Sequence, residues 1–347
     1  AKNSFALLAK THHAAIDGAS GVHFFELMHD LQPEPTHFPP PDKPWQPEPD
    51  PSPAELLFRT GLNNLSQPMR LAEVWSKQVS QGLRPMPNLN NDNMRARNVP
   101  RTRFNGKVTP HRIIGSVDFA LDDVRNIRKM VEGATVNDAV LAICGGALRH
   151  YLEAKNELDE QPMLAMAPVN TRTAATPTSE AGNQVSALFV QIGTDIEDPR
   201  ERLEAIHEET SASKIMHDAI GASAMTQYGE FVPAYTAAMA SRLMTDTAAS
   251  APVPPFNVSI TNVPGPQMPL YFCGAPMLST IGLGPITHGM GLIFPVLSYQ
   301  GRMTISFTSC REILADADFF ETCIQRAFNE LHSASEAWQN TQAADQE

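Results

Sequence analysis

Basic residues are scarce in this sequence, and their scarcity excludes one class of function. Only 26 Lys and Arg stand against 38 Asp and Glu, which gives a formal net charge of −12. A nucleic-acid-binding protein normally carries a basic excess that neutralises phosphates. We therefore expect no nucleic-acid partner, although an acidic average still permits a local basic patch for an anionic co-substrate.

Cysteine is also scarce, and its spacing shows no pairing pattern. The four cysteines are Cys144, Cys273, Cys310 and Cys323. None forms a Cys-x-x-Cys pair, and the first lies far from the others, so neither a disulfide framework nor a zinc cluster is expected. We interpret all four as buried thiols in a reducing compartment and expect no bound metal.

Long uninterrupted hydrophobic runs are absent as well. The most apolar long stretch, residues 274–299, is broken by Pro276, Pro285 and Pro295, whereas a membrane-spanning helix needs about 20 consecutive apolar residues. From the first residues we expect no signal peptide. We expect a cytoplasmic protein, and contact with a lipid surface stays open.

The residues that are present predict an α+β fold with a substantial sheet. The 347 residues, 42% of them hydrophobic, suffice for a sizeable core and two lobes. From apolar periodicity, strands are expected over residues 4–10, 112–121, 163–169, 185–192, 256–261, 276–281, 292–299 and 303–308. Helices are expected over residues 20–31, 54–83, 122–131, 135–154, 199–213, 228–244 and 316–334.

Proline-rich and polar stretches divide the chain into parts. The dense prolines of residues 33–53 predict an extended surface connection, with a proline-rich docking motif as the alternative. We assign residues 1–83 to an N-terminal lobe, 84–110 to a crossover linker and 111–347 to a C-terminal lobe. Because a domain rarely begins with a core strand, we expect this N-terminal lobe to be incomplete.

The segment Thr11-His12-His13-Ala14-Ala15-Ile16-Asp17-Gly18 carries the clearest chemical signal. Histidine suits general-base catalysis because its unperturbed pKa is about 6.5. Neighbouring side chains on a strand point to opposite faces, so only one of His12 and His13 can face a substrate. Asp17 is placed to fix the following turn, and Gly18 permits a tight backbone there.

Two other interpretations of this segment have to be weighed. A lone histidine at a strand end is more often structural than catalytic. Two histidines and an aspartate could also bind a metal, but the opposite facing of His12 and His13 argues against that. As a short pattern alone, His-x-x-x-Asp-Gly does not decide between these roles.

Several further segments, in the same order along the chain, extend this pattern into a resemblance. Together with His12-His13-Ala14-Ala15-Ile16-Asp17-Gly18, called the His motif below, they resemble the bacterial wax ester synthase/diacylglycerol acyltransferase family, within the coenzyme A-dependent acyltransferase superfamily. The segments are TVNDAVLAICGGALRHYL from Thr135, PVNTR from Pro168, Gly182-Asn183, NQVSALFVQIGTDIEDPRERL from Asn183, FNVSITNVPGP from Phe256, and His288-Gly289 through Ser298-Tyr299 to Arg311. The family's Pro-Leu-aromatic motif, which normally precedes the His motif, is not in this chain.

The resemblance implies a fold and an activity. The implied fold is a two-lobed, chloramphenicol acetyltransferase-like sandwich with a tunnel between the lobes. The implied activity is O-acyl transfer from acyl-CoA to a long-chain alcohol or a diacylglycerol, with no cofactor beyond acyl-CoA as co-substrate. Peripheral contact with the inner membrane or lipid inclusions, and with the missing N-terminal segment, is also implied.

The resemblance further implies a role for individual residues. His13 would be the general base and His12 a supporting residue. Asp17 would orient His13 by pairing with an arginine, for which Arg172 is the candidate, and Gly18 would complete the motif.

Other segments of the resemblance contain polar residues whose roles the resemblance leaves open. Asn137 and Asp138 match the family's Asn-Asp motif but equally suit a helix N-terminus, with Thr135 as N-cap. Asn262 would shape a turn at the channel wall. His288 is either a second polar group near the channel or a loop histidine.

Two competing functions remain at this point. One is a condensation-type acyltransferase that uses a carrier-protein thioester, and the other is a non-catalytic lipid-binding relative. The segment Asn262-Val263-Pro264-Gly265-Pro266 favours the lipid branch, and the intact His13 and Asp17 argue against a non-catalytic protein.

Overall fold

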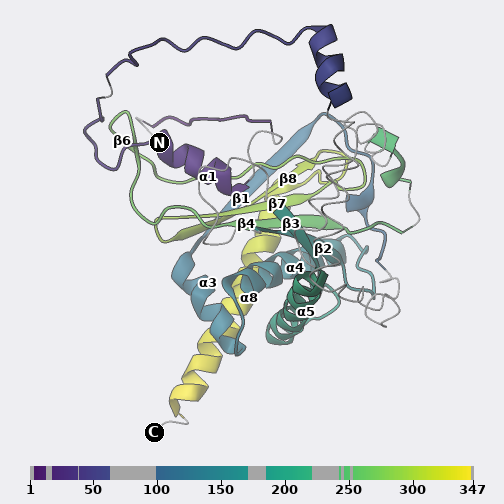
Figure 1. Ribbon diagram of the computed structural model, residues 1–347. Coiled ribbons are helices and arrows are strands. Elements are labelled where there is room, and N and C mark those ends of the chain that lie inside the picture. Colours follow the sequence, from purple (N-terminus) through teal and green to yellow (C-terminus); the bar gives the residue numbers. More distant parts are fainter. Residues whose placement is uncertain are drawn as a thin grey trace.

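The computed structural model describes residues 4–12, 18–37, 39–62, 99–170, 185–220, 242–243, 246–250 and 253–344. Within these residues, a six-stranded sheet in the order β1-β8-β7-β4-β2-β3 forms the centre of the molecule (Figure 1). Its strands are β1 Arg112–Ala120, β2 Leu164–Asn170, β3 Val185–Gln191, β4 Val258–Val263, β7 Ile293–Tyr299 and β8 Arg302–Cys310. A separate hairpin pairs β5 Tyr271–Phe272 with β6 Ala275–Pro276.

The sheet is mixed. Strands β1, β8 and β7 pair antiparallel at one end and β2 and β3 at the other, whereas β7, β4 and β2 run parallel in the middle. Parallel neighbours require crossover connections, and the chain between the parallel neighbours β2 and β4 contains β3 and α5. The predicted α+β fold is therefore confirmed.

The larger helices gather on one side of the sheet. In Figure 1, α3, α4, α5 and α8 lie on that side, whereas α1 lies on the other. The helical segments are α1 Gly18–Leu27, η2 Arg103–Asn105, α3 Leu121–Ile127, η3 Arg128–Met130, α4 Val136–Ala154, α5 Pro199–Ile220 and α8 Ala317–Ala344.

Helix α4 is the most deeply buried helix that the structure describes. It is buried almost continuously from Asp138 to Leu152, because α5 and α8 pack beside it and the sheet lies beneath it. Gly145 allows this close approach, since a Cβ atom there would lie 2.0 Å from the carbonyl oxygen of Ile192. The ring of Phe320 on α8 completes the core, with its centroid 5.0 Å from that of Phe307 in β8.

Most of the predicted elements are present, although several bounds shift. Strands β1, β2, β3, β4, β7 and β8 confirm six of the predicted strands, and α1, α3, α4, α5 and α8 confirm five of the predicted helices. Helix α8 runs ten residues beyond its predicted end at residue 334. Of the helix predicted over residues 54–83, residues 53–62 are helical and the remainder lies outside the described residues, as does most of residues 228–244.

Two predicted strands are wrong. Residues 4–10 have no regular secondary structure and are exposed, with Phe5 64% and Leu8 76% accessible, and no sheet partner pairs with them among the described residues. The strand predicted over residues 276–281 ends at Pro276. The chain beyond it lies against the sheet instead, where a Cβ atom on Gly282 would be 2.7 Å from Pro295.

The cysteines follow the prediction with one exception. All four are free thiols, and Cys144, Cys310 and Cys323 are buried. Burial raises the pKa of the Cys323 thiol to about 11. Cys273 is exposed, contrary to prediction, because it occupies the turn of the β5–β6 hairpin with φ at 50°.

None of the described helices combines the length and the apolar character required to cross a bilayer.

The close approach of α4 to the sheet gives a first testable prediction. Replacing Gly145 with Ala should lower the free energy of unfolding by about 1–3 kcal/mol, because the added methyl group meets a backbone carbonyl that cannot rotate away. The matched control is Gly61→Ala, where an added Cβ atom meets nothing within 4 Å. Urea unfolding checks both variants, and an unchanged midpoint for Gly145→Ala would contradict the packing described.

Candidate functional site

The structure describes the residues on both sides of the His motif. His12 lies at the end of the exposed extended segment, and Gly18 begins α1. Residues 13–17, which include His13 and Asp17, lie outside the described residues. The roles of His13 as base, His12 as support and Asp17 as orienting residue therefore stay predictions.

Helix α1 follows the His motif and packs against β4, the strand that carries Asn262. α1 lies in contact with β4, and Asn262 in β4 is half-buried and pairs with Val296 of β7. Beyond the strand, a Cβ atom on Gly265 would lie 2.2 Å from the carbonyl oxygen of Ser298, so only glycine fits there. The amide of Gly265 also donates to the Ser298 hydroxyl at 3.2 Å. This segment is held against β7, close to α1.

Asp138 is a structural residue in this arrangement. Its side chain is fully buried at the start of α4 and forms the predicted capping box with Thr135. Its two oxygens also accept from the Thr210 hydroxyl at 2.8 Å and lie 3.1 Å from His207 Nδ1, both on α5. Asp138 thus joins the N-terminus of α4 to α5, while the neighbouring Asn137 is half-buried.

His288 belongs to a turn that is hydrogen-bonded to the linker. Its Nδ1 accepts from the amide of Val108 at 3.0 Å. Beside it, the Gly289 amide donates to the carbonyl of Gly106 at 3.1 Å. The Asn105 side chain donates to the Gly289 carbonyl at 3.0 Å. The loop-histidine interpretation of His288 therefore has a structural basis, because its Nδ1 is engaged by the backbone.

A buried arginine that the sequence analysis missed lies among the helices. Arg172, the arginine predicted to pair with Asp17, lies outside the described residues. Arg202 on α5 is instead completely buried, and it donates to the carbonyls of Ile196 at 3.1 Å and Glu197 at 2.8 Å. Burial lowers the pKa of Arg202. Gly146 leaves room for its guanidinium, because a Cβ atom there would lie 2.3 Å from Nη1.

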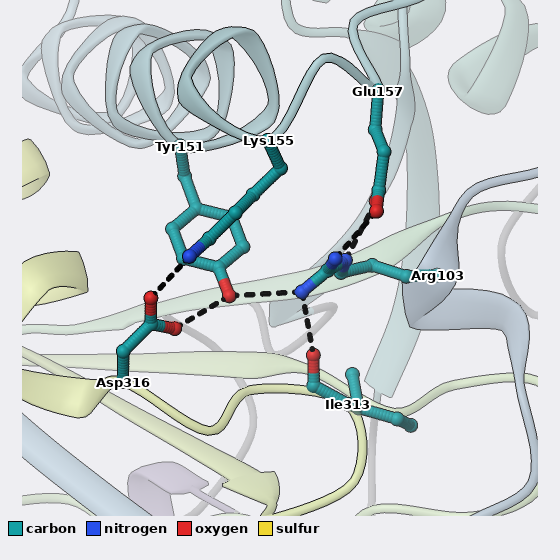
Figure 2. Close-up of polar contacts among 6 residues, drawn as sticks. All are labelled: Arg103, Tyr151, Lys155, Glu157, Ile313 and Asp316. Carbon is teal, nitrogen blue, oxygen red and sulfur yellow. Dashed lines mark hydrogen bonds and ion pairs between the residues drawn. The ribbon is translucent and has the colours of Figure 1, made fainter.

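A second missed feature is a polar network that fastens the linker to the helices (Figure 2). Arg103 in η2 forms a two-pronged ion pair with Glu157, with Nε 2.6 Å from Oε2. The same guanidinium donates to the Tyr151 hydroxyl at 3.0 Å and to the carbonyl of Ile313 at 3.3 Å. No local sequence pattern pointed to this network, because its members are far apart in the chain.

Asp316 closes the network from the side of α8. It accepts from the Tyr151 hydroxyl at 2.7 Å and forms an ion pair with Lys155 (Figure 2). Burial acts to raise the pKa of Asp316, but the hydrogen bonds from Lys155 and Tyr151 outweigh it and hold that pKa below its usual value. Burial raises the pKa of Tyr151, so the phenol stays protonated and donates. The network is suited to holding the linker in place.

The described residues contain no group of three His, Cys, Asp or Glu side chains arranged to hold a metal ion.

Comparison with solved structures places this fold among known ones. The chain superimposes on the wax ester synthase/diacylglycerol acyltransferase from Marinobacter aquaeolei VT8 with a TM-score of 0.63. The match covers 94% of this chain and 67% of that one, at 24% sequence identity. The two proteins therefore share a fold.

Comparison of sequences identifies the family. The model of the wax ester synthase/diacylglycerol acyltransferase catalytic domain matches residues 1–140, and that of the C-terminal domain of the same family matches residues 181–332. The chain belongs to the wax ester synthase/diacylglycerol acyltransferase family, as its motifs predicted.

Curated relatives agree with this assignment. The chain is 29% identical over 321 residues to the O-acyltransferase WSD of Acinetobacter baylyi, a match that covers 90% of this chain and 67% of that protein. It is also 29% identical over 325 residues to a Mycobacterium tuberculosis protein that has a provisional diacylglycerol O-acyltransferase name. That match covers 90% of this chain and 61% of the relative, so the chain spans less than two thirds of the relative's length.

The contacts of Asp138 predict a loss of stability on substitution. Asp138→Ala should lower the free energy of unfolding by about 2–4 kcal/mol, because it removes the cap and the carboxylate that joins α4 to His207 and Thr210, and Thr210 then keeps only the His207 carbonyl as acceptor. The neighbouring Asn137→Ala should change it by less than about 0.5 kcal/mol. Urea titration measures both, and equal effects of the two substitutions would contradict the assigned roles.

The ion pair of Arg103 and Glu157 predicts a pH-dependent contribution to stability. The hydrogen bond from Arg103 lowers the pKa of Glu157 below its usual 4.5. A carboxyl with a lowered pKa stabilises the fold above its unfolded-state pKa, and this contribution is lost as the pH falls through the folded-state value. Glu157→Gln should therefore cost at most about 1 kcal/mol at pH 7, since the pair is partly exposed.

Measured by urea unfolding from pH 7 to pH 3, the difference between wild type and Glu157→Gln should shrink below pH 4.5. Exposed Glu132→Gln, on the turn after η3, is the matched control. A difference for Glu157→Gln that stays constant with pH would show that the lost hydrogen-bond geometry, and not the charge, is responsible.

Proposed function

We propose that the whole protein is an O-acyltransferase that moves a fatty acyl group from acyl-CoA to the hydroxyl of a long-chain alcohol or a diacylglycerol. The observation that carries this proposal is that two domain models of one acyltransferase family match the chain in order, over residues 1–140 and 181–332. The first of them includes an intact His12-His13-x-x-x-Asp17-Gly18 motif. The relative named O-acyltransferase WSD supports the same reaction class.

The proposed chemistry needs one group that moves a proton. His13 takes the proton from the acceptor hydroxyl as its oxygen attacks the thioester carbonyl. The carbon–sulfur bond then breaks, and the imidazolium returns the proton to the departing thiolate of coenzyme A. General-base help of this kind contributes about 10²–10⁴-fold in rate.

The positions of three other histidines support His13 for this role. His207 and His288 both have Nδ1 within hydrogen-bonding distance of protein groups in structural positions, and His12 lies on an exposed segment. In the proposal Asp17 orients His13 by pairing with an arginine, and Arg172 stays the candidate. Asn262 and Gly265 shape the backbone beside α1.

We propose that the protein works in the cytoplasm with peripheral contact to a lipid surface, and apolar side chains on the surface support that contact. The helix over residues 53–62 exposes Leu57 by 75%, Phe58 by 67% and Leu62 by 53%. Leu56 is 50% exposed as well, and Glu55 forms an ion pair with Arg59 on the same helix. A helix that exposes several large apolar side chains can lie in the interface of a membrane or a lipid inclusion.

The test of this function is acceptor-dependent release of free thiol from palmitoyl-CoA, with hexadecanol or a diacylglycerol as acceptor. We expect release by wild type and a fall of about 10²–10⁴-fold in His13→Ala. His12→Ala, at the neighbouring position, should lose less because its role is supporting. Circular dichroism confirms that each variant is folded.

Two results would contradict the proposal. Equal activity of His13→Ala and wild type would remove His13 as the base. No release by wild type, even with the N-terminal region of a relative supplied, would favour a carrier-protein thioester as donor or a non-catalytic role. A carrier-bound acyl donor, assayed in parallel, separates these two alternatives.

A further inference from the structure

The β5–β6 hairpin contacts the chain after the His motif through its backbone. Asp30, which follows α1, exchanges two hydrogen bonds with Tyr271 of β5. The Asp30 amide donates to the Tyr271 carbonyl and the Tyr271 amide donates to the Asp30 carbonyl, both at 2.8 Å. Two such bonds make a local antiparallel bridge, so the downstream flank of the motif is fixed to the hairpin.

The same hairpin contacts both flanks through one aromatic ring. The centroid of Phe272 lies 6.3 Å from that of Phe5, which precedes the motif. It also lies 5.5 Å from the ring of His29, which follows it. Phe272 is therefore a single side chain that touches the chain before and after residues 13–17.

Local hydrogen bonds hold the residues that follow α1, Asp30 and His29, in place. The Asp30 carboxylate accepts from the amide of Thr36 at 3.0 Å, and this bond lowers the pKa of Asp30. His29 Nδ1 lies 2.6 Å from the carbonyl oxygen of Phe25 on α1. Asp30 and His29 are thus held relative to α1, and α1 begins at the last residue of the motif.

The hairpin itself is fixed to the core. The hydroxyl of Tyr299, at the end of β7, accepts from the amide of Leu270 at 2.8 Å and donates to the carbonyl of Met277 at 3.2 Å. These two groups lie on either side of the hairpin, and Tyr299 is only 3% exposed. At the turn, Gly274 has φ at 81°, and a Cβ atom there would lie 3.0 Å from the carbonyl oxygen of Pro33. The hairpin therefore links the sheet to the N-terminal segment.

We propose that the β5–β6 hairpin positions the His motif, with Phe272 as the positioning residue that holds both flanks of the motif against the sheet. Fixing the two ends of a short chain segment reduces the number of conformations open to it. A base held in one geometry reacts faster than a mobile one. The catalytic part of this inference rests on the proposed function, but the anchoring part does not.

The anchoring is tested without any enzymatic activity, by hydrogen exchange and mass spectrometry of the 347-residue chain. In Phe272→Ala, amides of residues 4–36 should exchange about two- to tenfold faster, the factor expected for one lost aromatic contact. Amides of α4 and α8 should not change. Phe272→Tyr keeps the ring and should restore protection, and Cys273→Ser, at the exposed turn of the same hairpin, should match wild type. Unchanged exchange of residues 4–36 in Phe272→Ala would overturn the proposal.

The catalytic consequence is tested by steady-state kinetics on the same variants. Phe272→Ala should lower kcat by about tenfold or more and leave KM for palmitoyl-CoA nearly unchanged, because a displaced base weakens the chemical step. Phe272→Tyr should recover most of kcat. Faster exchange with unchanged kcat would show anchoring without a role in positioning. If wild type has no activity, the proposed function fails, while the exchange result still decides the anchoring.

A covalent link tests the same contact where Phe272→Ala fails to fold. Asp30 and Tyr271 are paired directly opposite each other, a geometry whose Cα separation of about 5.5 Å suits a disulfide. In a Cys273→Ser background, Asp30→Cys with Tyr271→Cys should form a disulfide on mild oxidation. With Phe272 unchanged, the oxidised protein should exchange the amides of residues 4–36 no faster than wild type. Failure of the two cysteines to pair would contradict the bridge.

Discussion

The close contact between α4 and the strand end at Ile192 is the constraint on which the rest of the described structure depends. Gly145 brings the helix so near the sheet that a single methyl group would overlap a carbonyl oxygen. With α4 fixed at this depth, Asp138 at its start reaches α5, and Tyr151 near its end reaches both Arg103 and Asp316. Any outward displacement of α4 would break all three connections.

The linker before β1 takes its position from the same helix. Arg103 is held by Glu157 and Tyr151, and the Asn105 side chain donates to the carbonyls of Phe256 and Gly289. Arg103 also donates to the carbonyl of Ile313, so four separate parts of the chain meet at this three-residue helical turn. This explains why a segment with so little regular structure is buried at Phe104 and Asn105.

The N-terminal segment is joined to the sheet by a different route. It carries the His motif between Phe5 and Asp30, and it reaches the sheet through the β5–β6 hairpin and Tyr299. The helical side of the sheet holds buried residues such as Asp138 and Arg202, whose roles are structural. Helix α1, which begins at the last residue of the His motif, lies on the other side of the sheet (Figure 1). The buried polar residues of the helical layer and the helix that follows the motif thus lie on different faces of the same sheet.

The sequence by itself determined the elements whose signal is local. Alternation of apolar residues located β1 and β8, and Thr135 with Asp138 located the start of α4, because capping depends on residues three positions apart. The ordered motifs also identified the family. The sequence could not place residues 4–10 or 276–281, because a short apolar run becomes a strand only where a partner strand is available.

Only the tertiary structure decided which polar residues act together. Arg202 packs against Gly146. Arg103, Tyr151 and Asp316 belong to one network, in which Arg103 and Asp316 are 213 positions apart in the chain. The same holds for Phe272, which touches Phe5 and His29 although nothing in its own neighbourhood predicts it. Such contacts follow from the packing of whole elements, and no local pattern of residue types encodes them.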